Sequence, residues 1–313
     1  MSKLDSVSRR QFVAGLGTTV AAVAGLGLVG CGSSSSSSSD SSSASAALSG
    51  TVNCSGATSF QSLVEAAAKK FEDANEDVTI AITGGGSGQG LSDVKDGKAQ
   101  IGRSDVFAEE KLDAADAAKL TDNTVCVVGM GPIVNSNVDV DDLTTEQLKG
   151  IFTGTITDWS EVGGTAGKIQ VIERKAGSGT RATFEAAVLA GEKAPDSFAP
   201  VAEEDSSGTV VEKIQATEGS ISYLAFSYFD DTKFKALKVD GVEPKADNVA
   251  AGKFNIWAYE HMYTAADCDD VTKAFIDYML SDEVQGSLVE EEGFIPVSDM
   301  KVSKDADGNV TTK

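Results

Sequence analysis

The stretch VIERKAGSGTRATFEAAVLA, residues 171–190, carries a basic pair, a glycine–serine–glycine turn and then a run with helical spacing. An apolar, strand-like segment leads into it at residues 169–172. A strand–loop–helix junction of this kind can hold a phosphate, can seat a nucleophile, or can simply turn the chain into a helix. The stretch alone does not separate these three roles, so the distinction must come from the rest of the chain.

Strands and helices alternate along the chain from residue 50 onward. Apolar runs typical of strands lie at residues 52–54, 78–82, 99–102 and 124–134. Helical spacing of apolar residues marks residues 60–71 and 271–279. This alternation predicts an α/β fold with mostly parallel sheets that are covered on both faces.

Two further strand–loop–helix junctions, at residues 55–60 and 84–90, are also built from small polar residues and glycines. In α/β sheets, ligands bind beyond the carboxyl ends of the strands, where the first N–H groups of the next helix point at the ligand. Small residues let an anion approach these backbone donors. Three such junctions that converge on one point would hold an anion mainly with neutral donors.

Composition narrows the classes of partner. The chain has 313 residues, 41% of them apolar, and a formal net charge of −22 with only 26 lysines and arginines. This length predicts more than one domain, and this charge excludes nucleic acid as a partner, because a phosphate backbone needs a basic face.

None of the four cysteines forms a CxxC pair, so no zinc site or other metal site is predicted. Cys54 and Cys126 lie in apolar runs, which favours buried free thiols over a disulfide to Cys268.

The first 31 residues have the features of an export signal. Arg9 and Arg10 precede an uncharged apolar run at residues 12–29, and SRRQF at residues 8–12 resembles a twin-arginine motif. The run ends in LVGC, which resembles a bacterial lipobox with Cys31 as the lipidated residue. The general secretory route and an uncleaved anchor helix stay open as alternatives. Residues 32–49 are mostly serine and alanine and predict a flexible linker, so we expect the folded body outside the cytoplasmic membrane.

The order of these motifs resembles the substrate-binding lipoproteins of phosphate ABC transporters, which have the type II periplasmic-binding-protein fold. The resemblance covers residues 50–300 and rests on six segments: SGATSF at 55–60, GGGSGQGLSDVKDGKAQIGRSD at 84–105, LTTEQLKGIFTGTITDWSEVGG at 143–164, ERKAGSGTRATFE at 173–185, EGSISYLAFSYF at 218–229 and EGFIPVSD at 292–299. The segment at 143–164 and the GSGTR loop are the specific ones.

The resemblance implies two α/β lobes with a ligand cleft between them. We expect the first lobe to comprise residues 50–131 and 256–313, and the second to comprise residues 132–255. It also implies binding of inorganic phosphate in the cleft and delivery to the permease of an ABC transporter, by a monomer that has no cofactor and is not an enzyme. The protein would be anchored to the cell membrane through the lipid on Cys31.

The family's phosphate ligands carry over where the motifs match. The implied set is Thr58, Ser59, Phe60, Ser87, Asp105, Arg174, Ser178, Gly179 and Thr180. Arg174 would be the one cation, in forked hydrogen bonds to two phosphate oxygens. Asp105 would accept a hydrogen bond from a phosphate O–H but repel sulfate, which carries no proton near neutral pH.

Two points about the implied set stay open. Some members of the family have an acidic residue where Ala176 stands, and that side chain would restrain the arginine. Arg181 is a possible additional ligand, and Arg103 is a weaker candidate.

Enzymatic alternatives have little support in the motifs. The α/β-hydrolase motif Gly-x-Ser-x-Gly is incomplete around both Ser178 and Ser87, and His261 is the one histidine of the chain. A Walker-type phosphate-binding loop is also absent, because GGTAGKI at residues 163–169 has Ile169 where serine or threonine would be needed. A cell-surface phosphoesterase and a binding protein for another oxyanion, sulfate or molybdate, remain the alternatives.

Overall fold

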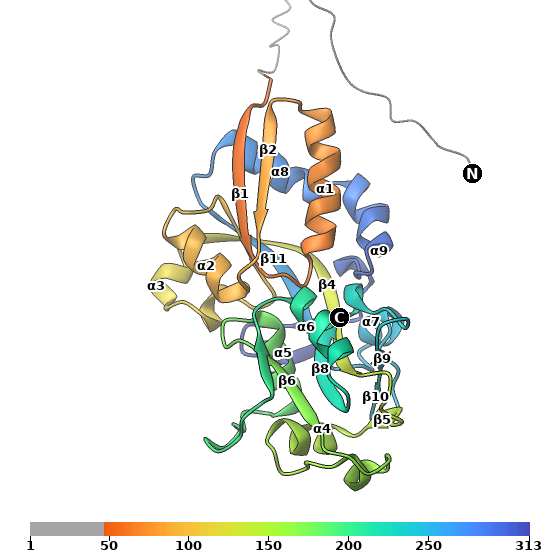
Figure 1. Cartoon of the computed structure of the whole chain (residues 1–313). Helices are drawn as coiled ribbons and strands as arrows, with labels where there is room; N and C mark the ends of the chain where they lie inside the picture. The colour runs from red at the N-terminus through yellow and green to blue at the C-terminus, as the bar shows by residue number, and fades with distance from the viewer. Residues whose placement is uncertain (1–46) are drawn as a thin grey trace, which may run out of the picture. The chain divides into compact units, whose positions relative to one another are not determined.

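Two long strands, β4 (Leu120–Val134) and β11 (Trp257–Ala265), cross the middle of the protein side by side (Figure 1). The computed structural model describes residues 47–313. The predicted signal peptide, the lipidation site at Cys31 and nearly all of the predicted linker therefore lie outside the described residues. Within residues 47–313, no helix is both long enough and apolar enough to cross a membrane.

The main sheet has nine strands. Eight of them follow the order β2-β1-β3-β11-β4-β8-β6-β7, and β9 pairs with β4 beside this path. The remaining strands of this sheet are β1 (Gly50–Gly56), β2 (Val78–Thr83), β3 (Ile101–Ser104), β6 (Gln170–Arg174), β7 (Ala202–Glu204), β8 (Ser220–Ala225) and β9 (Lys235–Ala236). Two small sheets pair β5 (Asp142–Leu143) with β10 (Lys238–Val239), and β12 (Val302–Lys304) with β13 (Val310–Thr312).

The sheet has two halves that meet in β4. Residues 120–129 of β4 pair with β11, and residues 130–134 pair with β8. The pairs β1–β2, β1–β3, β6–β7 and β6–β8 are parallel, as predicted, whereas β3–β11, β11–β4, β4–β8 and β4–β9 are antiparallel. The prediction of mostly parallel sheets thus needs correction at the centre. One central strand carries the chain from the first half into the second and the other carries it back, so they run in opposite directions.

Nine α-helices pack around the strands of the described residues. They are α1 (Gln61–Ala74), α2 (Ser87–Lys95), α3 (Ala114–Ala117), α4 (Thr145–Phe152), α5 (Gly179–Val188), α6 (Ser207–Ala216), α7 (Ala246–Ala250), α8 (Asp270–Met279) and α9 (Val289–Glu291). In α1, Leu63, Val64, Ala67 and Phe71 recur at helical spacing and are buried, which is why this segment forms an amphipathic helix against the sheet. The predicted α/β fold is confirmed.

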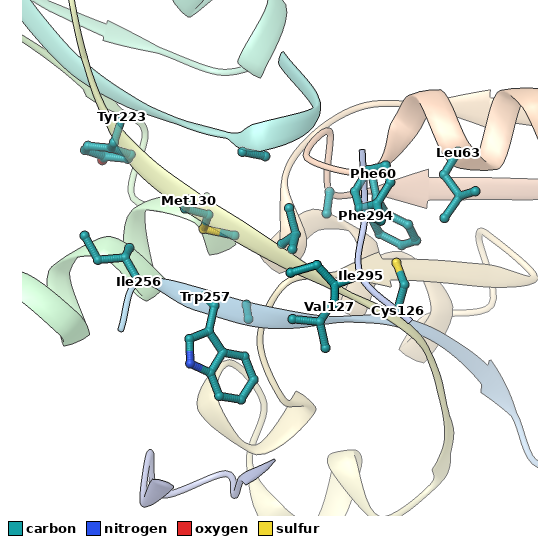
Figure 2. Close-up of a cluster of buried hydrophobic side chains, with 14 of the residues drawn as sticks. Phe60, Leu63, Cys126, Val127, Met130, Tyr223, Ile256, Trp257, Phe294 and Ile295 are labelled. Carbon is teal, nitrogen blue, oxygen red and sulfur yellow. The ribbon is translucent and has the colours of Figure 1, made fainter. Parts of the chain in front are cut away.

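The apolar core continues across the two halves of the sheet. Figure 2 shows Cys126, Val127 and Met130 along β4, with Trp257 beside them and Phe60 at the start of α1. All five side chains are buried and belong to one cluster. Cys54 and Cys126 are buried free thiols, as predicted, and Cys268 is also free.

Close packing places α2 directly on the strands. A β-carbon added at Gly90 of α2 would lie 2.6 Å from the carbonyl oxygen of Arg103 and 2.9 Å from the Cα of Gly56. Only glycine fits a backbone approach this close. The contact fixes the start of α2, and therefore Ser87, at the carboxyl ends of β1 and β3.

Candidate functional site

A buried carboxylate lies where three predicted junctions meet. Asp105 follows the last residue of β3 and is 3% exposed. Its Oδ1 accepts hydrogen bonds from the hydroxyls of Ser59 at 2.6 Å and Ser87 at 3.4 Å, and its Oδ2 accepts one from Thr180 at 2.8 Å. The starts of α1, α2 and α5 therefore converge on one aspartate, which is the convergence that the sequence predicted.

Arg174 ends β6 beside this carboxylate and is held by the backbone. Its Nε donates to the carbonyl oxygen of Glu204 at 3.3 Å, and one terminal nitrogen donates to the carbonyl oxygen of Asp205 at 3.1 Å. The acidic restraint that is missing at Ala176 is thus replaced by two carbonyl groups, of the last residue of β7 and of the residue after it. These bonds fix the plane of the guanidinium without neutralising its charge.

The other terminal nitrogen of Arg174 points at the hydroxyl groups of the site. It lies 3.5 Å from Oγ1 of Thr180 and 3.3 Å from Oγ of Ser207. Burial lowers the pKa of Arg174, and the nearby charge of Asp105 works in the opposite direction. A guanidinium keeps its proton in proteins. The guanidinium of Arg174 is therefore a buried positive charge close to the buried carboxylate of Asp105.

Ser207 is a residue of this site that the sequence reasoning missed. It is fully buried at the start of α6, its hydroxyl lies 3.2 Å from that of Thr58, and its backbone N–H donates to Thr58 Oγ1 at 3.1 Å. Ser206 caps the helix by accepting from the N–H of Thr209 at 3.1 Å. The segment EEDSSGTV at residues 203–210 is a fourth strand–loop–helix junction of the same type, and its small polar residues were the available signal.

The remaining predicted residues shape the helix starts. Phe60 is the N-cap residue of α1, and its ring is buried. Ser178 caps α5: its hydroxyl accepts from the N–H of Arg181 at 3.2 Å, so that oxygen is turned toward its own helix. Gly179 begins α5, and a β-carbon there would lie 2.1 Å from Ser87 Oγ. The second and third junctions are therefore in direct contact.

The two further arginines are placed differently. The Arg181 guanidinium bonds to the carboxylates of Glu185 at 2.7 Å and Glu203 at 3.1 Å. Arg103 is fully buried, and one of its terminal nitrogens donates to the carbonyl oxygen of Thr83 at 2.5 Å. Within the described residues neither of these guanidinium groups bonds to a hydroxyl of the site, whereas that of Arg174 bonds to Thr180 and Ser207.

Hydrogen bonds across the site join the two halves of the sheet. The N–H of Gly88 donates to the carbonyl oxygen of Gly177 at 3.0 Å, and the Tyr228 hydroxyl donates to the carbonyl oxygen of Thr58 at 2.7 Å. Gly88 and Thr58 belong to the half that contains β1, and their partners belong to the half that contains β6. The site thus lies at the boundary between the halves.

The arrangement provides donors for an anion. Three serine or threonine hydroxyls, helix-start N–H groups and one guanidinium surround a carboxylate that can accept a bond from a protonated ligand. His261 pairs with Ser104 of β3 and is buried, and its Nδ1 is 2.8 Å from a carboxylate oxygen of Asp122. Among residues 47–313, no group of three or more histidine, cysteine, aspartate or glutamate side chains is arranged to hold a metal ion.

Comparisons with known proteins show the family of this chain. The family model described as a PBP superfamily domain matches residues 41–283. The Phosphate-binding protein PstS of Bacillus subtilis is 48% identical over 260 residues, which are 83% of this chain and 85% of that protein.

Solved structures are similar over most of the chain. A phosphate ABC transporter substrate-binding protein from Clostridium perfringens, crystallised with bound phosphate, is 34% identical with a TM-score of 0.73, covering 79% of this chain and all of that one. An ABC-type phosphate transport receptor from Vibrio cholerae is 29% identical with a TM-score of 0.62, covering 78% of this chain and 99% of that one. The chain therefore belongs to the PBP superfamily and, within it, to the family of the PstS phosphate-binding proteins.

Proposed function

We propose that this protein binds inorganic phosphate at the Asp105 site. The ligand set we propose consists of Thr58, Ser59, Phe60, Ser87, Asp105, Arg174, Ser178, Gly179 and Thr180, to which we add Ser207. Arg181 is left out, because its guanidinium is already bonded to two carboxylates. The relatives whose names state phosphate binding support this choice of anion.

The observation that carries the proposal is a carboxylate inside an anion site. An ionised aspartate can only accept hydrogen bonds, so it suits an oxyanion that keeps a proton near neutral pH. Phosphate keeps at least one proton there, whereas sulfate keeps none. Asp105, surrounded by hydroxyl donors and close to Arg174, therefore favours phosphate over sulfate by repelling the fully ionised anion.

We also propose that the two halves of the sheet act as lobes. The first lobe would comprise residues 50–131 and 256–313, and the second residues 132–255. The switch of β4 from β11 to β8, between Gly129 and Met130, lies two residues before the first of these boundaries and supports a division within β4. Closing of the lobes around the ligand would be a hinge motion, and the hydrogen bond from Gly88 to Gly177 would belong to the closed arrangement.

Delivery to a transporter completes the proposed function. The protein would be a monomer outside the cytoplasmic membrane, anchored through a lipid on Cys31, and would hand phosphate to the permease subunits of an ABC transporter. It would use no cofactor and perform no covalent chemistry. The transport function stated in the names of its relatives supports this role.

Isothermal titration calorimetry of the purified protein against phosphate, sulfate and molybdate tests the ligand. We expect phosphate to bind at least 100-fold more tightly than sulfate, because two unpaired like charges at about 4 Å repel by roughly 4 kcal/mol in a site of this kind. Tighter binding of sulfate or molybdate would overturn the choice of anion. Turnover of a generic phosphoester that is lost in Ser178→Ala would favour an enzyme instead.

A matched pair of arginine variants tests the site. Arg174→Lys keeps the charge but removes the forked donors, so we expect phosphate affinity to fall roughly 10- to 100-fold. Arg181→Lys makes the same chemical change in α5, at a guanidinium bonded to Glu185 and Glu203, and should alter affinity by less than about threefold. Equal effects of the two substitutions would contradict the assignment of Arg174 as the cation that binds the ligand.

A further inference from the structure

A second acidic residue lies behind Asp105. Glu260 is on β11, next to His261, which pairs with Ser104 of β3. Continuing this antiparallel register places Glu260 opposite Asp105. On its other side Glu260 pairs with Cys126 of β4, and the register shifts between Glu260 and His261. Irregularities of this kind re-aim side chains and are common beside functional sites.

The surroundings of the two carboxyl groups differ sharply. Glu260 is fully buried, and neither of its carboxyl oxygens has a hydrogen-bond partner in the described part of the chain. Asp105 has three hydroxyl donors and lies near the charge of Arg174. An ionised carboxylate that is buried without donors is strongly disfavoured, whereas one with several donors and a nearby cation is stabilised.

Few other charges act on Glu260. Burial and then the charge of Asp105 raise its pKa well above the usual range, while the nearby hydroxyl of Ser59 and the charge of Arg103 act in the opposite direction. The neighbouring thiols are neutral, since burial raises the pKa of Cys126 and raises that of Cys54 to about 11. The charged and titratable groups that act on Glu260 directly are Arg103 from β3, Asp105 just after β3, and Cys126 from β4, together with the uncharged hydroxyl of Ser59. Cys54 from β1 acts only through its contact with Arg103. The core around Cys126 is apolar, as Figure 2 shows for Phe60 and Phe294.

We propose that Glu260 is a positioning residue for Asp105: it carries the single proton of this carboxyl pair and thereby keeps Asp105 ionised. Two carboxyl groups this close in a buried site share one proton rather than ionise together. Ser59 has one hydroxyl proton and donates it to Asp105 at 2.6 Å. Glu260, which has fewer donors, therefore takes the proton, and Asp105, which has three, keeps the charge. The functional role of Glu260 rests on the proposed function, because an ionised Asp105 is the acceptor that would select a protonated oxyanion.

A neutral Glu260 also limits the negative charge of the site to one. If Glu260 ionised, a second negative charge would lie behind Asp105 and would repel a phosphate dianion. The alternative is an ionised Glu260 that serves as the counter-ion of Arg103, whose Nε and one terminal nitrogen are buried without a hydrogen-bond partner in the described residues. The two alternatives predict different protonation states of one residue, and infrared spectroscopy reads that state directly.

The first experiment is infrared spectroscopy of the full-length protein without phosphate at about pH 9, where ordinary carboxyl groups are ionised. We expect the carbonyl-stretch band of a protonated carboxylic acid in the wild type and its loss in Glu260→Gln. Glu173→Gln is the matched control: Glu173 is also a buried glutamate, but its pKa is raised only to about 7 and its carboxyl bonds to Tyr223. The band should persist in that variant. Selective isotope labelling of glutamate in Glu173→Gln assigns the band even if Glu260→Gln fails to fold.

The second experiment compares phosphate titrations at pH 7 to 9. Because glutamine is neutral and has a similar shape, Glu260→Gln should bind phosphate within about threefold of the wild type and unfold within a few degrees of it. Absence of the band in the wild type, together with a loss of roughly 10 °C in Tm for Glu260→Gln, would assign Glu260 as the counter-ion of Arg103 and overturn the proposal. Failure of the wild type to bind phosphate would refute the proposed function, while the infrared result would still decide the protonation of Glu260.

Discussion

Replacing Asp105 by asparagine changes one charge in the site while leaving its shape almost unchanged. The carboxylate accepts from Ser59 at 2.6 Å and Thr180 at 2.8 Å. An amide keeps one acceptor oxygen and places an NH₂ group where the second oxygen was. Hydroxyl groups can rotate to accept from this new donor, so we expect Asp105→Asn to fold. The substitution changes the affinity of the site for phosphate, which carries a proton, relative to its affinity for sulfate, which carries none.

The size of the change follows from the lost charge. A hydrogen bond from phosphate to a carboxylate stabilises the complex by about 1.5–3 kcal/mol, and a hydrogen bond to a neutral amide oxygen stabilises it by about 1 kcal/mol. Phosphate affinity should therefore fall roughly 10-fold. Sulfate loses a repulsion that is about 4 kcal/mol for unit charges 4 Å apart at an effective dielectric constant of 20. Sulfate affinity should therefore rise roughly 100- to 1,000-fold.

Calorimetric titrations of both anions at neutral pH measure this discrimination. Asp93→Asn is the matched control, because Asp93 also accepts a bond from a serine hydroxyl, that of Ser55 at 2.9 Å, in the same half of the protein. Its anion affinities should remain within about threefold of the wild type. If Asp105→Asn rejects sulfate as strongly as the wild type, the charge of Asp105 is not the basis of selectivity and the reasoning is refuted.

Three further predictions concern other parts of the site and its support. Ser207→Ala removes a hydroxyl that contacts both Thr58 and Arg174, so phosphate affinity should fall roughly 5- to 20-fold in the same titration. Gly179→Ala places a β-carbon 2.1 Å from Ser87 Oγ, where only glycine fits, and should weaken phosphate binding more than Ser207→Ala does. Its Tm should change little, because the lobes can avoid the clash by staying further apart. Burial raises the pKa of Glu173 to about 7, above its unfolded value of about 4.5, so the wild type should lose about 3 kcal/mol of stability as pH rises from 4.5 to 7. Denaturant unfolding should show no such decline in Glu173→Gln, and an equal decline in both proteins would contradict the burial of this charge.

The local chemistry of the chain determined the elements and the loops of the site. Small polar residues between an apolar run and a helical repeat identified the starts of α1, α2 and α5. Those three starts supply Ser59, Ser87 and Thr180, and the end of β3 supplies Asp105, which are the groups that the structure brings together. This part was predictable because a helix start, its cap and its exposed N–H groups are set by a few consecutive residues.

Only the tertiary structure decided the strand directions at the centre of the sheet, the partners of Arg174 and the surroundings of the buried acids. The antiparallel centre of the sheet follows from the direction in which β4 and β11 cross between the halves, and neither strand specifies that direction by itself. The carbonyl groups that restrain Arg174 carry no side-chain signal, because every residue has one. Glu260 is a buried acid in a segment without any motif, and its neighbour Asp105 is distant along the chain. Hydrogen bonding and burial belong to the folded arrangement of several segments, so which acid is ionised and which is neutral cannot be read from either segment alone.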